Sequence, residues 1–178
     1  MTQFKQLTLG SRNTPMNSIY GTCERTCAKL QIYSGDMHPS VVTERLGIVP
    51  TSVIVKGEFS PRNSRGLRRV RVGKINGWFL SSEDFVPSKD VRHHLDWILE
   101  RLEAKKVVLL ELQDVPGVKM FIFCPWWSKH GQGGPTLWPE QMRGMAELNL
   151  ECAFDFADMS EHAAEDLQSN LPLGAQTV

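Results

Sequence analysis

The sequence predicts an α+β fold, in which a mixed, mainly antiparallel sheet has helices packed on one face. Three observations predict it. Short segments in which apolar and polar residues alternate, as is typical of strands, recur along the chain. Segments with apolar residues three and four positions apart, typical of amphipathic helices, lie between them. The order strand, helix, strand occurs in each half, around 30–56 and around 118–156, so we expect two strand–helix–strand halves.

The first half begins with a strand and a short helix. Between Ala28 and Tyr33 apolar residues alternate with polar ones, as in a strand with one buried face. Pro39 suits the first position of a helix, and Gly47 suits the left-handed residue that ends one. Pro50 then disfavours helix, and the β-branched run at 52–56 predicts a buried strand.

The clearest predicted helix lies in the middle of the chain. Ser88 is expected to cap it, and an apolar stripe at helical spacing runs from Val91 to Leu102. The next segment, Val107–Leu112, fits either a strand or a helix, and its leucine and glutamate content favours the helix.

The second half completes the predicted sheet. Residues 118–124 predict a strand that is apolar on both faces apart from Lys119, and Pro125 is expected to end it. Such a strand belongs in the middle of a sheet, with helices on one face and helices, a loop or a second subunit on the other. Pro139 is expected to begin a helix, and the alternation in Leu150–Phe156 predicts the last strand.

Composition divides the chain of 178 residues into three parts. Residues 1–26 are polar and show no lasting period, so we expect a flexible N-terminal arm. Residues 27–157 contain the predicted elements and are expected to form a single α+β domain. Residues 158–178 lack a regular apolar pattern and predict a flexible acidic C-terminal tail.

Charge is balanced overall but unevenly placed. Twenty basic and 20 acidic residues give a net charge of zero, so no overall field favours nucleic acid or a membrane as partner. The loop Arg62–Lys74 nevertheless has six basic residues and no acidic one, whereas no Lys or Arg follows Arg143. No segment approaches the roughly 20 apolar residues of a membrane span, and the N-terminus has no apolar secretory core. We therefore expect a cytoplasmic protein.

The four cysteines are expected to be free thiols. A reducing compartment does not favour disulfides, and Cys124 and Cys152 both fall in predicted strands. Cys23 and Cys27 lie four positions apart, with no second pair at the spacing of a zinc site. We therefore expect no metal and no cofactor.

Four segments carry a resemblance to a known family. They are LQIYSGDMHPSVVTERLGIVPTSVIVKGE, GWFLSSE, DVRHHLDWILERLEAKK and PTLWPEQMRGMAELNLECAFDF, in that order. In them the chain resembles an uncharacterised bacterial family, the domain of unknown function 4279, over about Cys27 to Ala157. The resemblance implies a compact bacterial α+β domain. It implies no established activity and no catalytic residues.

Function is predicted from surface features, because no motif identifies a reaction. We expect a non-enzymatic binding or interaction module, immunity-like or regulatory, with a protein partner. Aromatic residues at a strand end, a neighbouring histidine and a basic loop are typical of such a surface. The candidate binding residues are Trp126, Trp127, His130, Arg65, Arg68, Arg69, Arg71 and Trp78.

Three alternatives stay open. A hydrolase or transferase could use the strand end at Cys124–Gly134, with His130 as base, although the sequence has no Gly-x-Ser-x-Gly or His-Glu-x-x-His motif. Weak nucleic-acid binding through Arg62–Lys74 is less favoured, because that loop has no aromatic residue. A homodimer is the third, since a second copy would cover a sheet that is apolar on both faces.

Overall fold

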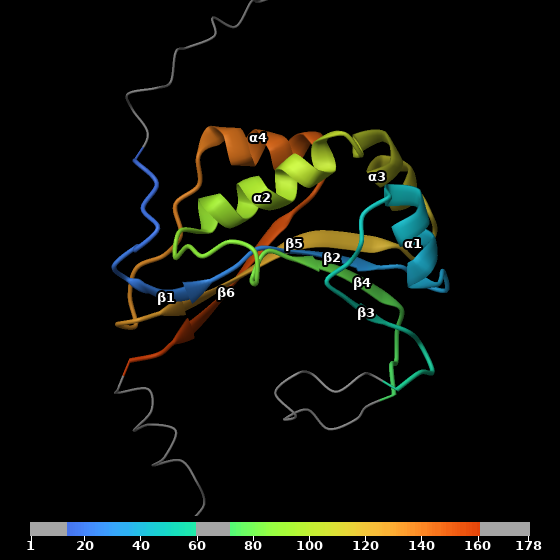
Figure 1. The fold of residues 1–178 in the computed structure, drawn as a ribbon, viewed down its shortest axis with the longest axis horizontal. Helices are drawn as coiled ribbons and strands as arrows, with labels where there is room; N and C mark the ends of the chain where they lie inside the picture. The colour runs from blue at the N-terminus through green and yellow to red at the C-terminus, as the bar shows by residue number, and fades with distance from the viewer. Residues whose placement is uncertain (1–13, 60–71, 161–178) are drawn as a thin grey trace, which may run out of the picture.

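The computed structural model describes residues 14–59 and 72–160, which form one sheet with four helices on one side of it (Figure 1). The strands are β1 (Cys23–Thr26), β2 (Lys29–Tyr33), β3 (Ser52–Ile54), β4 (Gly77–Ser81), β5 (Lys119–Ser128) and β6 (Cys152–Asp158). The helices are α1 (Pro39–Leu46), α2 (Val91–Glu103), α3 (Lys106–Gln113) and α4 (Pro139–Glu147). The pairing of β5 with β6 is parallel and the others are antiparallel. The predicted α+β class, with a mixed, mainly antiparallel sheet, is therefore confirmed.

The strand order follows from the pairing of β5. This strand pairs with β2 through its first half, with β1 through its second half, and with β6 along residues 122–128. Because a strand has only two edges, β1 and β2 lie end to end along one edge of β5 and β6 lies along the other. The order across the sheet is therefore β6, β5, β1 with β2, β4 and β3. The strands β3 and β6 form the two edges, and the short β1 also has only one strand neighbour among the described residues.

The two strand–helix–strand halves are both present, but they differ. In the second half, α4 connects β5 to β6, and these strands are parallel neighbours. In the first half, α1 connects β2 to β3, but β4 lies between these two strands and is antiparallel to both. The unit around α4 is thus a direct crossover, whereas the unit around α1 is split by an inserted strand.

Pro125 does not end the fifth strand, contrary to the prediction. The N–H of Ile122 donates to the backbone C=O of Glu151, and the C=O of Ser128 accepts from the N–H of Met159. The backbone groups of even-numbered residues in β5 therefore point toward β6. Pro125 therefore points toward the other edge, opposite the break between β1 and β2. Its missing N–H removes no ladder bond there, and its carbonyl accepts from Thr26 Oγ1 at 2.9 Å.

The helices cover one face of the sheet and enclose the core. The predicted stripe on α2 is buried, with Val91, Leu95, Ile98 and Leu102 at most 1% exposed. It packs with side chains from alternate positions of the central strands, among them Ala28, Leu30, Ile32, Trp78, Leu80, Ile122 and Cys124. Residues 107–112 lie in α3, so the helix favoured for them is confirmed.

The helix ends follow local rules, with one correction. Pro39 begins α1, and Gly47 follows it in the left-handed conformation at φ 63°, as predicted. The predicted cap of α2 is wrong by two residues. Asp90 is the cap, and its Oδ1 accepts from the backbone N–H of Arg92 at 3.1 Å. Ser88 instead accepts from the N–H of Asp90 at 3.0 Å and so supports the cap residue.

The β-branched run at 52–56 forms a shorter and more exposed strand than predicted. Only Ser52–Ile54 belong to β3, and Val53 is 40% exposed. The strand lies at the edge of the sheet and pairs with β4 alone, so it has no second neighbour to bury it.

The described chain extends beyond the predicted domain on both sides. The sheet begins with β1 at Cys23, within the segment that the sequence predicts as an arm, and β6 ends at Asp158. The basic loop is described only at its base, where Phe59 pairs with Val72 and Lys56 with Gly73. The predicted residues Arg65, Arg68, Arg69 and Arg71 lie outside the described residues.

Candidate functional site

Two of the predicted binding residues lie inside the molecule. Trp126 is 1% exposed, and the ring of Tyr20 packs edge-on against it at 5.2 Å between centroids. Trp78 is 0% exposed, and its Nε1 donates to Thr43 Oγ1 at 3.0 Å. A ligand at the surface cannot touch either indole, so neither belongs to an accessible site.

Trp127 lies on the opposite face from Trp126, because successive side chains of a strand point to opposite faces. No described helix covers this face (Figure 1). The guanidinium of Arg25 lies over the Trp127 ring, 3.9 Å from its centroid, and this is the geometry of a cation–π contact. Trp127 is half-buried beneath Arg25 but still reaches the surface.

Trp127 ends a row of aromatic side chains on the helix-free face. By alternation along β5 and pairing with β2, the row also contains Phe123, Phe121 and Tyr33. Each of these four side chains is partly exposed. Tyr33 contacts Phe121 at 6.1 Å between ring centroids and Phe79, which is 9% exposed, at 5.9 Å. Tyr33, Phe121 and Phe79 therefore form a cluster of rings, and Phe123 and Trp127 lie further along β5 on the same face, which no described helix covers.

Cations are interleaved with these rings. The strand register places Arg25 opposite Trp127, Lys29 opposite Phe123 and Lys119 opposite Tyr33. Directly opposite residues in antiparallel strands share a face and lie about 5 Å apart. We call the seven residues of this surface the aromatic–cationic face; they are Arg25, Lys29, Tyr33, Lys119, Phe121, Phe123 and Trp127.

The sequence had placed Trp127 in the binding surface but not the other six residues. The sequence did contain an indication of this surface, because residues 118–124 are apolar on both faces of the strand apart from Lys119. The helices cover one of these faces, and the other needs a different cover. What the sequence lacked was the register that brings β1, β2 and β5 together. His130 is exposed in the loop that follows β5.

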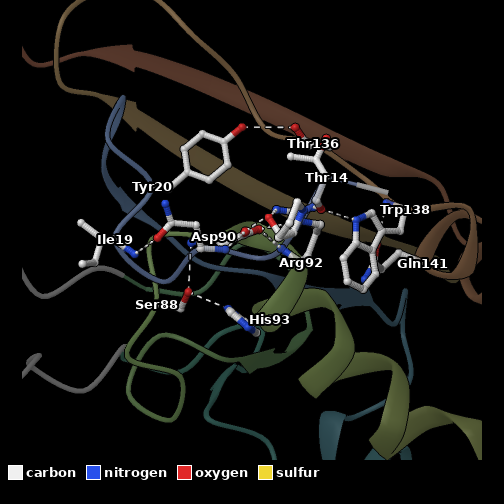
Figure 2. A network of polar contacts seen from close by, with 12 residues as sticks. Thr14, Ile19, Tyr20, Ser88, Asp90, Arg92, His93, Thr136, Trp138 and Gln141 are labelled. Atoms are coloured by element: carbon white, nitrogen blue, oxygen red, sulfur yellow. Dashed lines mark hydrogen bonds and ion pairs between the residues drawn. The ribbon is translucent and has the colours of Figure 1, made fainter. Parts of the chain in front are cut away.

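A buried ion pair fixes the segment that covers Trp126 (Figure 2). The side chains of Asp90 and Arg92 are both 0% exposed and are joined by two hydrogen bonds, at 2.5 and 2.8 Å. Arg92 also donates to the carbonyls of Thr14 and Pro15, and Trp138 Nε1 donates to that of Thr14. Residues 14–22 thus cross the beginning of α2 and bring Tyr20 onto Trp126.

The protonation of this pair follows from its contacts. Burial alone would raise the pKa of Asp90, but hydrogen bonds from Arg92 and from Asn17 N–H outweigh it and lower the pKa. The hydrogen bond to Asp90 raises the pKa of Arg92. The pair is therefore ionised over the whole neutral range. Its hydrogen bonds to the backbone of Thr14, Pro15 and Asn17 fasten this segment to the start of α2.

Two serine–histidine pairs have side chains within hydrogen-bond distance, and the first of them is buried. His94 Nε2 donates to Ser88 C=O at 2.8 Å, and its Nδ1 lies 2.8 Å from Ser82 Oγ, which also contacts Ala28 C=O at 2.9 Å. Ser82 and His94 are at most 1% exposed, so no substrate reaches them. Burial lowers the pKa of His94, in keeping with a neutral ring.

The second pair joins Ser88 Oγ to His93 Nδ1 at 2.8 Å (Figure 2). Both residues line a shallow hollow of about 420 Å³. The same hydroxyl accepts from the N–H of Asp90 and so supports the start of α2. Among the described residues no carboxylate is hydrogen-bonded to His93, so the group that orients the base in a triad is not there.

The cysteines are free, as predicted, and the raised pKa values of Cys23, Cys27 and Cys124 make these three poor nucleophiles. Burial raises the pKa of Cys23 to about 11 and also raises that of Cys27. The Sγ atoms of Cys124 and Cys152 lie 3.8 Å apart, and this contact, with burial, raises the pKa of the inner thiol, Cys124. Residues 14–59 and 72–160 contain no cluster of three or more His, Cys, Asp or Glu able to hold a metal ion.

The comparisons with known proteins point to one family. The family model described as "Domain of unknown function (DUF4279)" matches residues 23–159, and this confirms the resemblance found in the sequence. No curated protein and no solved structure matches the chain. Within the part that the structure describes, every helix is too short or too polar to cross a membrane.

Proposed function

We propose that this chain, which belongs to the DUF4279 family, is a non-enzymatic binding module that recognises a protein partner through the aromatic–cationic face. The observation that carries the proposal is the register of β1, β2 and β5, which sets three cations opposite three aromatic residues on a face without helices. Aromatic residues and Arg are enriched in the cores of protein interfaces. An immunity or regulatory protein, whose task is to bind another protein, fits this arrangement.

The charge of the face defines the partner's chemistry. Lys29 and Lys119 form no ion pair with another described residue, and Arg25 has only a 3.6 Å pair with Glu83. An acidic patch with apolar side chains would therefore complement the face, since complementary potentials give specificity and fast association. The free thiols support a reducing compartment, and we place the protein in the bacterial cytoplasm.

A protein partner is favoured over nucleic acid. Stacked aromatic residues with cations also describe single-strand binding surfaces. However, Asp155 lies beside Pro125 on the same face, Glu83 partly neutralises Arg25, and the chain has no net positive charge. Positive charge that no nearby carboxylate neutralises strengthens the binding of phosphate groups. A surface that carries both positive and negative charges is better suited to a protein partner.

The proposal is tested by capture followed by reconstitution. Wild-type protein and the double variant Lys29→Glu/Lys119→Glu are used to capture partners from cells of the source organism. The control, Lys106→Glu/Arg143→Glu, makes the same charge change at exposed positions on α3 and α4. We expect one stoichiometric protein that is retained by wild type and control. With the purified partner, the face variant should raise Kd at least about tenfold.

Two results would contradict the proposal. One is a partner whose Kd changes equally in the face and control variants, since the binding surface would then lie elsewhere. The other is tight binding of a labelled single-stranded oligonucleotide that weakens steeply with salt, which would identify a phosphate-binding protein.

A further inference from the structure

The two edges of the sheet are protected to different degrees. The edge strand β3 has three residues, and directly after it Glu58 N–H bonds back to Val55 C=O in a turn. The other edge strand, β6, has seven residues, with no proline, no lysine and an unbroken register with β5. Natural edge strands are usually shortened, charged with lysine or bulged, because their unpaired backbone groups attract other strands. β6 carries two aspartates, but it is neither short nor bulged and has no proline, so its backbone edge is the more open of the two.

The open backbone groups of β6 can be identified. Glu151 C=O and Met159 N–H both bond to β5, so odd-numbered residues point toward β5. By alternation the backbone groups of Cys152, Phe154 and Phe156 point away from it. These groups form no hydrogen bond to another described residue. An added strand could therefore form hydrogen bonds with the N–H and C=O groups of these alternate residues.

The side chains beside this edge are apolar and acidic. Phe156 and Met159 are each 57% exposed. Glu151 and Asp155 are exposed carboxylates, and no Lys or Arg occurs anywhere after Arg143. A second copy would bring two acidic strands together, and like charges on paired strands are destabilising. A strand with basic side chains would meet complementary charge along the same edge.

The geometry points to the edge of β6 as a docking site for an extended, basic segment of a partner protein, which adds to the sheet as a further strand. Main-chain hydrogen bonds to Cys152, Phe154 and Phe156 would provide affinity, and the side chains around them would select the sequence. This site lies on the edge of the sheet, so the inference does not depend on the aromatic–cationic face.

Amide hydrogen exchange on the ¹⁵N-labelled full chain tests the inference directly. The probe is a short peptide of alternating Lys and Val. Without peptide, the N–H groups of Phe154 and Phe156 should exchange faster than those of Ala153 and Asp155, which face β5. With peptide, the exchange of Phe154 and Phe156 should slow at least about tenfold, while the inward groups change little. A peptide of alternating Glu and Val should give no protection.

Three variants make the test specific. Phe156→Pro removes an outward N–H without touching the β5 ladder, and Phe156→Ala is the matched control that keeps the N–H. We expect the proline to raise Kd for the basic peptide at least about tenfold more than the alanine does. Should the proline variant not fold, the double variant Glu151→Lys/Asp155→Lys takes its place, and it should prefer the acidic peptide.

Several outcomes would overturn the inference. Equal binding of the basic and acidic peptides would show that charge does not select the docked segment. No binding of either peptide would show that the edge does not accept an added strand. Protection confined to β3 would locate strand addition at the other edge. A wild-type dimer in sedimentation that Phe156→Pro converts to monomer would show that a second copy occupies the edge.

Discussion

Arg92 and Asp90 are the residues on which the position of the N-terminal segment depends. Removing two charges from water is unfavourable, and only several well-formed hydrogen bonds offset that cost. Arg92 makes such bonds to Asp90 and to the carbonyls of Thr14 and Pro15. Asp90 completes its own set with the N–H groups of Asn17 and Arg92. Every side-chain nitrogen and oxygen atom of the pair thus has at least one hydrogen-bond partner.

Replacement of one partner should destabilise the protein strongly. In Arg92→Met the Asp90 carboxylate stays buried without its cation, and we expect the free energy of unfolding to fall by about 3–5 kcal/mol. Adding Asp90→Asn to this variant should restore part of the lost free energy of unfolding, because it removes the unpaired buried carboxylate. Urea denaturation of the three variants measures this cycle. A loss below about 1 kcal/mol for Arg92→Met would mean that the pair is solvated.

His94 gives stability a defined dependence on pH. Burial lowers the pKa of His94 below its ordinary value of 6.5, so the folded state keeps the ring neutral. As pH falls below 6.5 the unfolded chain binds a proton that the folded state does not, and the free energy of unfolding falls until the folded pKa is reached. Urea denaturation at about pH 7.5 and about pH 5.5 measures the loss. His94→Gln should show a smaller loss, and an equal one would refute this origin.

At the scale of elements, α1 shows how far local chemistry determines a boundary. Pro39 fixes its first residue, and the left-handed conformation of Gly47 ends it. Both rules act within a few residues, so the sequence was sufficient to predict them. Pro125 shows the opposite case. Its place inside β5 depends on the break between β1 and β2, nearly a hundred residues earlier, and no local rule contains that contact.

Gly47 offers a test of the local rule. A Cβ added there would meet only Lys105 Nζ, at 3.5 Å, so the cost of Gly47→Ala comes from the positive φ. We expect a loss of about 1 kcal/mol in the free energy of unfolding, measured with urea. Gly21→Ala is the control, because that glycine has no positive φ and open space around it. Its loss should stay below about 0.5 kcal/mol.

At the scale of the whole molecule, the chain separates a closed face from an open one. The helices close one face, and residues 14–22 extend this cover over Trp126 through Tyr20. Tyr20 is held there by its hydroxyl, which donates to Gly134 C=O at 3.0 Å. The opposite face carries the aromatic–cationic residues without a described helix over them (Figure 1). Trp126 and Trp127 therefore lie on opposite faces of the sheet, the first buried and the second partly exposed.

Removal of the Tyr20 ring should expose Trp126. We expect Tyr20→Ala to shift the tryptophan fluorescence to longer wavelength and to lower the free energy of unfolding by about 2 kcal/mol, since the ring is only partly buried. Tyr20→Phe keeps the ring and loses the hydroxyl contacts alone, so it should cost about 1 kcal/mol without a spectral shift. An unchanged spectrum in Tyr20→Ala would show that other groups cover Trp126.

The candidate site was less predictable than the fold for a physical reason. Hydrophobic periodicity identified the elements, because burial of one face leaves a repeating pattern in each segment. A surface site depends instead on which strands become neighbours. Trp126 and Trp127 are adjacent in sequence, and only the register of β5 shows that one is core and the other surface. Lys29 and Phe123 are far apart in sequence and meet only in the sheet.

The central proposal for this protein is that the helix-free face of the sheet binds a protein partner. The most direct measurement is the change in backbone amide chemical shifts of the ¹⁵N-labelled chain when the captured and purified partner is added. We expect the largest changes at Lys29, Gln31, Phe121, Phe123 and Trp127, with little change along α2 and α4. Changes concentrated on α2 and α4 would place the partner on the helical side and contradict the account.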